Sequence, residues 1–251
     1  NIVESLSSGT PVVCFKKTAV SEIVKHKKNG FFVDIGANDG VTGSNSYFFE
    51  KEMAQAQVRL EFAAGTYDEK EMPAIQIFNE YFGGGMAGLV FQELREARAL
   101  AYSAWANYFT ASHPDEENIL VGSIGCQADK TIEAVHAFMD LLENMPLNHT
   151  RWESTHSSIL SSYRTNPIPF RSTGGYVYDM KVLGLDKDPR ENRFDILKAA
   201  TSKTLKEFYE QTIKPKAKLL SIVGDSTKID LAELEKIGPV IQIKSDQLFT
   251  R

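Results

Sequence analysis

The polar and apolar positions of this chain follow two periods, and these periods predict its elements. In residues 55–62, apolar side chains occupy every second position and polar ones lie between them. This alternation is typical of a strand with one buried face. Apolar residues three and four positions apart instead indicate a helix with one buried stripe. Further strands are expected over residues 100–110, 118–126, 218–223 and 240–243, and helices over residues 69–81, 86–95, 129–145, 149–164, 169–183, 190–199, 201–213 and 229–237.

The order of these elements indicates an α+β fold. Strands come early, a group of helices follows, and strands return near the end, which differs from regular strand–helix alternation. We therefore expect a mostly antiparallel sheet covered by helices, preceded by a short N-terminal α/β fragment. In the helix expected over residues 86–95, Met86, Leu89, Val90 and Leu94 recur at helical spacing and are predicted to form its buried stripe.

A glycine turn introduces that helix. Gly83, Gly84 and Gly85 are consecutive, and glycine accepts backbone angles that other residues resist, so a sharp turn and a close approach of a second segment are expected. Arg95 falls in the last turn of the helix, and Tyr102 follows seven residues later on a strand. A guanidinium and a phenol held by two rigid elements suit a clamp for a peptide carbonyl or carboxylate.

The stretch YFGGGMAGLVFQELREARALAYSA, residues 81–104, resembles the second, zinc-free half-domain of the pitrilysin/insulinase metallopeptidases. That family includes the mitochondrial processing peptidases, and its motif runs F-G-G-G-M-S-x-x-L-F-x-x-L-R-x-x-x-x-L-A-Y. The resemblance covers about residues 53–245. It implies that two half-domains face each other around a chamber, and that the zinc-free half supplies an Arg and a Tyr to the substrate. Arg95 and Tyr102 match these positions, and Gly83, Gly84 and Gly85 would border the chamber.

The zinc motif of the family is missing from the sequence. Members that cut peptides carry H-x-x-E-H, and none of the five histidines begins such a motif. The nearest approach is His149 to His156 with Glu153 between them, but ligands two turns apart on a helix rarely converge on one ion, so a solvated helix is favoured. We expect no catalytic residue, metal or cofactor in this chain alone. Zinc is expected in a partner half-domain, joined in cis or in trans.

The first 52 residues match other families. Residues 1–32, with ESLSSGTPVV and Glu4, resemble the last nucleotide-binding βα unit of a GT-B glycosyltransferase. Residues 31–50 resemble the first motif of an FkbM-like, S-adenosylmethionine-dependent methyltransferase, with its glycine turn at Asp34, Gly36 and Gly40. A lone glycine turn is common in sharp strand-to-helix connections, so no bound cofactor is expected. The predicted organisation is therefore 1–52 as fused fragments that are not an independent domain, and 53–251 as the peptidase-family half-domain.

Composition narrows the range of partners. Of the 251 residues, 42% are apolar and 24% charged, as is ordinary for a globular protein, and the net charge of −5 offers no basic stripe for nucleic acid. No apolar run approaches the length of a membrane span, so no membrane partner is expected. The two cysteines lie far apart, which argues against a disulfide framework and a cysteine zinc site. The sequence does not fix the compartment.

Three functions remain in competition. The first is a non-catalytic, substrate-binding half of a pitrilysin-type zinc metallopeptidase, with a peptide substrate and a zinc-bearing H-x-x-E-H partner half. The second is a non-enzymatic scaffold of the same fold, as in respiratory-chain core subunits that resemble processing peptidases. Taken singly, Arg95 has the alternative of a surface ion pair with Glu93 or Glu96, and Tyr102 that of a core tyrosine. The third is a methyltransferase or glycosyltransferase remnant working through residues 1–50.

Overall fold

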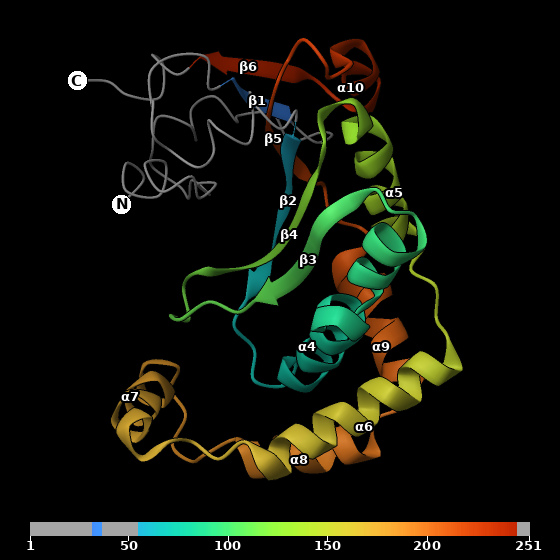
Figure 1. The fold of residues 1–251 in the computed structure, drawn as a ribbon. Helices are drawn as coiled ribbons and strands as arrows, with labels where there is room; N and C mark the ends of the chain where they lie inside the picture. The colour runs from blue at the N-terminus through green and yellow to red at the C-terminus, as the bar shows by residue number, and fades with distance from the viewer. Residues whose placement is uncertain (1–31, 37–54, 245–251) are drawn as a thin grey trace, which may run out of the picture.

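A six-stranded sheet forms the centre of the protein in the computed structural model, which describes residues 32–36 and 55–244 (Figure 1). The strand order is β3-β4-β2-β5-β1-β6. Strands β3, β4, β2 and β5 pair antiparallel, whereas β1 runs parallel to both β5 and β6. The strands are β1 (Phe32–Gly36), β2 (Gln55–Thr66), β3 (Ala101–Phe109), β4 (Glu117–Gln127), β5 (Leu219–Gly224) and β6 (Val240–Lys244).

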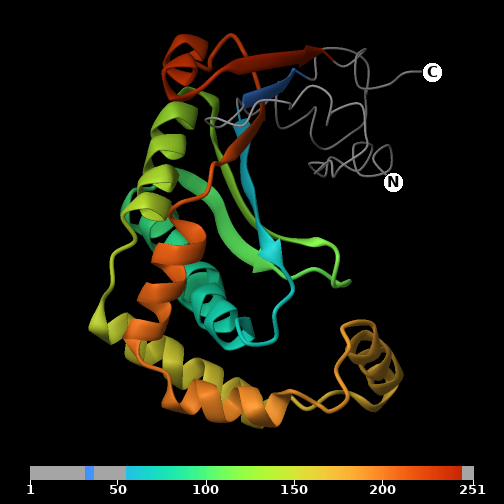
Figure 2. The same ribbon diagram turned by 180° about the vertical axis from the view of Figure 1, so that it is seen from behind.

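Helices cover one face of this sheet, as the two opposite views show (Figures 1 and 2). Helix α5 lies directly on the sheet, because the ring of Phe138 fills the space where Gly122 of β4 has no side chain. The helical segments are α4 (Met72–Phe78), η1 (Asn79–Gly83), η2 (Gly85–Ala87), η3 (Phe91–Ala97), η4 (Ala128–Lys130), α5 (Thr131–Glu143), α6 (His149–Thr165), η5 (Phe170–Ser172), α7 (Thr173–Val182), α8 (Arg190–Ala199), α9 (Ser202–Phe208), η6 (Tyr209–Ile213) and α10 (Leu231–Ile237).

The core lies between the sheet and these helices. On β2, Ala56, Val58 and Leu60 are buried, whereas Gln57, between Ala56 and Val58, is exposed. The strand therefore has the buried face that its alternation predicts. Aromatic rings from the helices complete the core, with Phe78 and Phe82 stacked at 5.1 Å between ring centroids. Each such side chain contributes about 1.5–3 kcal/mol by leaving water.

Segment η1 lies along the outer edge of β3. The Asn79 side-chain Nδ2 donates to the Tyr108 carbonyl oxygen at 2.9 Å, and the Tyr108 backbone N–H donates back to Asn79 Oδ1 at 2.7 Å. A Cβ atom added at Gly83 would lie 1.8 Å from the carbonyl oxygen of Ala106. Only glycine fits here, so the close approach expected at the glycine turn is present.

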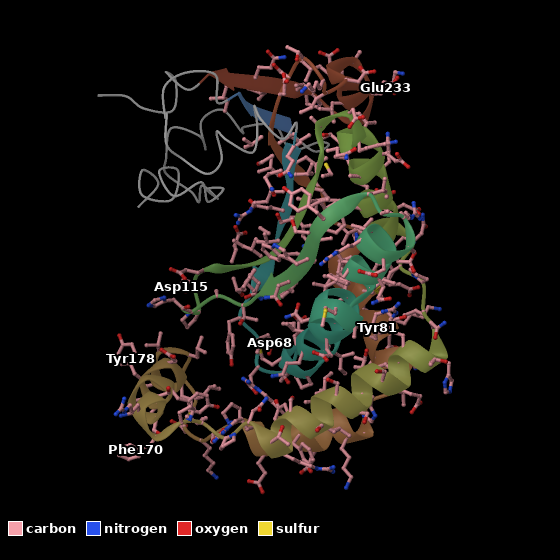
Figure 3. All side chains as sticks on the ribbon, in the orientation of Figure 1. Asp68, Tyr81, Asp115, Phe170, Tyr178 and Glu233 are labelled. Atoms are coloured by element: carbon pink, nitrogen blue, oxygen red, sulfur yellow. The ribbon has the colours of Figure 1, made fainter. Side chains whose placement is uncertain are left out.

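A buried tyrosine connects η1 to the helices behind it. The hydroxyl of Tyr81, labelled in Figure 3, donates to the Pro146 carbonyl oxygen at 2.8 Å and accepts from the Asn148 backbone N–H at 2.9 Å. Both bonds go to the connection between α5 and α6. They fix the start of α6, where the Asn148 side chain caps the helix by accepting from the Arg151 N–H.

The α+β fold predicted from the sequence is confirmed, with one error in the glycine-turn helix. Met86, assigned to the buried stripe, is 74% exposed. The reason is that Gly85–Ala87 forms a separate 3₁₀ turn and Gly88 is extended (φ −62°, ψ 151°), so the helical register begins only after Gly88. Leu94, in the helix proper, is buried as predicted. Within the described residues, no helix is both long and apolar enough to span a membrane.

Candidate functional site

Among the described residues, Tyr102 lies on the sheet face opposite the one that the helices cover (Figure 1). We call this the open face and define it by Gln57, Tyr102, Trp105 and Phe109. Tyr102 is 45% exposed, so the alternative of a core tyrosine is wrong. The β3–β4 register shifts between Ala101 and Ser103, which makes Tyr102 the extra residue of a bulge. Bulges commonly redirect a side chain out of the regular alternation.

The Tyr102 side chain crosses β4 to reach β2. Its hydroxyl oxygen accepts a hydrogen bond from Gln57 Nε2 at 2.7 Å. The ring passes over Gly125, where an added Cβ would lie 2.6 Å from Cζ and 2.7 Å from the hydroxyl oxygen of Tyr102. The phenol is therefore held flat across the sheet by contacts on two neighbouring strands.

The surroundings of Tyr102 keep its phenol protonated. Partial burial raises the pKa of Tyr102, and the nearby Cys126 thiol adds to the rise, while the hydrogen bond from Gln57 opposes it. Since an ordinary tyrosine already titrates near pKa 10, a raised value leaves the hydroxyl neutral at physiological pH. The group can then donate a hydrogen bond to a ligand oxygen.

Arg95 occupies the last turn of η3, as predicted, but its contacts are local. Its guanidinium lies 4.8 Å from the Phe91 ring centroid, and its Nε is 3.8 Å from Glu96 Oε1. The surface ion pair considered as an alternative for Arg95 is thus present, with Glu96. Among the described residues, no hydrogen bond or ion pair joins Arg95 to Tyr102. Both side chains are about half exposed and available to a ligand.

The turns around the helix are conformationally demanding. Gly85 has a φ of +59° and open space at its Cβ position, whereas a Cβ at Gly84 would lie 2.2 Å from the carbonyl oxygen of Glu80. Ala99, in the link between η3 and β3, has a φ of +50°. Non-glycine residues rarely adopt this left-handed conformation, so the link that orients Arg95 relative to Tyr102 is sharply constrained.

The histidines considered as metal ligands serve other roles. His156 stacks on Trp152 with ring centroids 5.4 Å apart, and its Nε2 lies 2.8 Å from the Leu197 carbonyl oxygen. His149 is exposed and 4.0 Å from Glu153. In the part of the chain that the structure describes, no group of three or more His, Cys, Asp or Glu side chains is placed to hold a metal ion.

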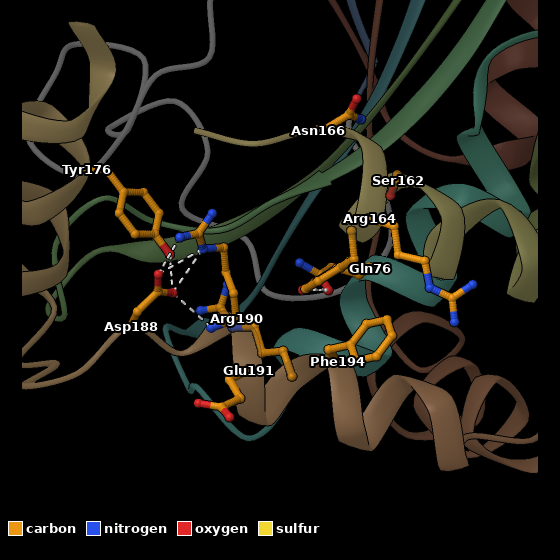
Figure 4. A pocket seen from close by; sticks show the side chains of 11 residues that line it. Gln76, Ser162, Arg164, Asn166, Tyr176, Asp188, Arg190, Glu191 and Phe194 are labelled. Atoms are coloured by element: carbon orange, nitrogen blue, oxygen red, sulfur yellow. Dashed lines mark hydrogen bonds and ion pairs between the residues drawn. The ribbon is translucent and has the colours of Figure 1, made fainter. Parts of the chain in front are cut away.

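A pocket of about 680 Å³ lies elsewhere, between the end of α6 and the start of α8 (Figure 4). Neither Arg95 nor Tyr102 lines it. Arg190 binds both carboxylate oxygens of Asp188, to which the Tyr176 hydroxyl also donates at 3.1 Å. The hydrogen bonds from Arg190 lower the pKa of Asp188 to about 2. The charges of Asp188 and Arg190 pair with each other, and the bond from Tyr176 links α7 to the start of α8. This arrangement is typical of a structural network.

Sequence reasoning missed the two residues that hold Tyr102. The alternation of β2 places Gln57 on its polar face, but the pairing that brings Gly125 and Tyr102 beside it is a property of the sheet. The glycosyltransferase-like Glu4 and the Gly40 of the glycine turn lie outside the described residues, whereas Asp34 and Gly36 lie within β1.

Comparison with known proteins places the chain in a family. A family model described as the peptidase M16 inactive domain matches residues 21–153, just over half of the chain. This match begins inside the first 52 residues, and the comparisons do not support the two N-terminal resemblances. A search of curated proteins returned no match.

Solved structures share the fold. They include a peptidase M16 inactive domain from Pseudomonas fluorescens (14% identity, TM-score 0.64), a protease from Helicobacter pylori (12%, 0.62) and a conserved protein from Enterococcus faecalis V583 (15%, 0.62). The alignments cover 80%, 80% and 81% of this chain but only 45%, 46% and 44% of those chains. The chain thus spans less than half the length of these structures. On the family match and this shared fold, it belongs to the peptidase M16 inactive domain family.

Proposed function

We propose that this chain is the substrate-binding, non-catalytic half of a pitrilysin-type zinc peptidase. The observation that carries the proposal is Tyr102, a half-exposed residue of the open face whose hydroxyl oxygen accepts a hydrogen bond from Gln57. A neutral phenol in this position can donate a hydrogen bond to a peptide oxygen. Family membership supplies the context, because an inactive half implies a catalytic counterpart.

In the proposed complex, the two halves divide the chemistry. The partner half would hold zinc through its H-x-x-E-H motif and supply the activated water. Tyr102 would donate to the oxyanion that develops at the scissile carbonyl, and Arg95 would orient the peptide. Removing one such donor typically lowers turnover by about 10²–10³-fold.

The present contacts of Arg95 are compatible with this role. Its ion pair with Glu96 is exposed on both sides, and exposed pairs of this kind contribute about 0–1 kcal/mol. A peptide carbonyl or carboxylate that reaches Arg95 can therefore compete for the guanidinium at little cost. The Phe91 ring beneath it limits the directions in which the guanidinium can move.

The length of the similar structures supports a partner. This chain covers only 44–46% of them, which leaves room in each for a second half of similar size. We therefore infer that the catalytic half acts with this one, either on the same polypeptide or as a separate subunit. Residues 1–52 have no part in this proposal.

A scaffold role is the alternative, and the local pairing of Arg95 favours it. If Arg95 serves only to bind Glu96 and cover Phe91, the open face need not contact substrate. The same fold would then serve assembly, as the respiratory-chain subunits resembling processing peptidases imply. The two functions differ in whether the side chains of Arg95 and Tyr102 affect cleavage.

Reconstituted cleavage separates the two functions. The chain is mixed with a zinc-bearing half and a quenched fluorescent peptide, and kcat/KM is measured for wild type, Arg95→Ala and Tyr102→Phe. We expect losses of about 10²–10³-fold for Tyr102→Phe. Thr110→Ala, directly after β3 and outside the open face, is the control for a general disturbance of this strand. Cleavage at the wild-type rate by both Arg95→Ala and Tyr102→Phe would instead identify a scaffold.

A further inference from the structure

One row of residues crosses three strands beneath the Tyr102 ring. The pairing places Gln57 of β2 opposite Gly125 of β4, and Gly125 opposite Ser103 of β3. Tyr102, displaced from this row by the bulge, leans back over Gly125 and ends at Gln57. Two residues distant in sequence therefore decide where the phenol lies.

We propose that Gln57 and Gly125 are positioning residues for Tyr102. Gly125 leaves the space through which the ring crosses β4, and the Gln57 amide donates to the phenolic oxygen. A phenolic hydroxyl has one proton to donate and an oxygen that accepts. Because Gln57 Nε2 donates to the phenolic oxygen at 2.7 Å, the hydroxyl proton is not used in this bond and is available to a ligand.

The sequence around the row makes the arrangement specific. A Cβ at Gly125 would lie 2.6 Å from Tyr102 Cζ and 2.7 Å from Ser103 Oγ, so even alanine would lift the ring from the sheet. Leucine at position 57 would keep the approximate size of glutamine but remove the donor. Glutamate at position 57 would reverse the direction of the bond. Its carboxylate would accept a hydrogen bond from the phenolic hydroxyl, which could then no longer donate to a substrate.

This inference rests on the proposed function only for the role of Tyr102 in cleavage. A first experiment therefore tests whether Gln57 positions the phenol, without any cleavage assay. Tyrosines are labelled with ¹³C at Cζ, and the Tyr102 signal is identified by its loss in Tyr102→Phe. We expect Gln57→Leu to raise the pKa of Tyr102, because a donor to the phenolate is removed. Gln127→Leu, the same exchange at an exposed position on β4, leaves it unchanged. Identical Tyr102 titrations in wild type and Gln57→Leu would overturn the proposal.

Gly125→Ala tests the second residue in the same spectra. We expect the Tyr102 signal to move while the other eight of the nine tyrosine signals keep their positions, which shows that the sheet remains folded. An unmoved Tyr102 signal in this folded variant would exclude Gly125 as a positioning residue.

Reconstituted cleavage then tests what the position serves. Gln57→Leu should lower kcat/KM by about 3- to 10-fold, the usual effect of one hydrogen bond, and should add no loss in a Tyr102→Phe background. Independent losses in the double variant would show that Gln57 acts other than through Tyr102, against the proposal. If Tyr102→Phe and Arg95→Ala both cleave normally, the proposed function fails, and the titration still decides whether Gln57 positions the phenol.

Discussion

Gly83 is the position where the glycine turn meets β3, and Gly83→Ala tests that contact directly. The added methyl group would lie 1.8 Å from the Ala106 carbonyl oxygen and 2.8 Å from its carbonyl carbon. Both atoms belong to the backbone of an edge strand, so no side-chain rotation can relieve the clash. Either η1 or β3 must shift, and the shift also strains the two hydrogen bonds between Asn79 and Tyr108.

The magnitude follows from what surrounds each glycine. Overpacking in a core costs about 1–3 kcal/mol, and a backbone clash belongs at the upper end of that range. A loss of about 3 kcal/mol lowers Tm by about 6–12 °C in a chain of this size. Gly85→Ala has open space but a φ of +59°, so it should lose only about 1 kcal/mol. Gly174→Ala, in the first turn of α7 with open space at its Cβ position, should gain about 0.4–1 kcal/mol.

Urea unfolding followed by circular dichroism, together with thermal melts, measures all three variants against wild type. The expected order of stability is Gly174→Ala, wild type, Gly85→Ala, Gly83→Ala. If Gly83→Ala unfolds within about 0.5 kcal/mol of wild type, η1 does not rest against β3, and the structural reason for the glycine turn is lost.

Three further predictions concern buried or partly buried polar groups. Tyr108→Phe should lose about 1–2 kcal/mol of unfolding free energy, because the Ala64 carbonyl oxygen loses its donor; stability equal to wild type in urea would contradict this. Burial alone would raise the pKa of Glu69, but hydrogen bonds from Arg193 and Tyr67 lower it overall. The ionised carboxylate therefore stabilises the fold above its unfolded pKa of about 4.3. This stability is lost as pH falls through the pKa of Glu69 in the folded protein. Glu69→Gln should therefore lose about 1–2 kcal/mol at neutral pH and approach wild type in acid, and a pH-independent difference in urea unfolding would refute the ion pair with Arg193. Burial raises the pKa of Cys126 to about 11, so in a Cys14→Ser variant the thiol should react with Ellman's reagent far more slowly in the folded protein than in denaturant; equal rates would show that Cys126 is accessible.

The elements were predictable because their periods are strong and local. The alternation of residues 55–62 fixes both the strand and its buried face, and the structure extends the same strand to Thr66. The helix containing Leu94 and Arg95 was also placed correctly. Met86 was not, because Gly88 interrupts the helix, and a hydrophobic period counts apolar residues without registering such a break.

The site was predictable only in part. Arg95 and Tyr102 stand out through their spacing and the motif around them, whereas their surroundings depend on tertiary contacts. The bond from Gln57 to Tyr102 requires a particular register across β4, and the bulge at Tyr102 changes which way the ring points. Neither the register nor the bulge can be predicted from the residues around Tyr102 alone, because register is set by the pairing of whole strands.

The side-chain amide of Asn79 has a consequence for aggregation through the edge of the sheet. Strand β3 is an edge strand of the sheet. An exposed edge strand offers unpaired backbone groups with which strands of other chains can pair and aggregate. At Tyr108 the Asn79 amide imitates the missing neighbour strand, and at Ala106 the glycine of η1 closes the gap. A foreign strand would have to displace a helix before it could pair there. The glycine turn therefore also protects the β3 edge against edge-to-edge pairing with other chains.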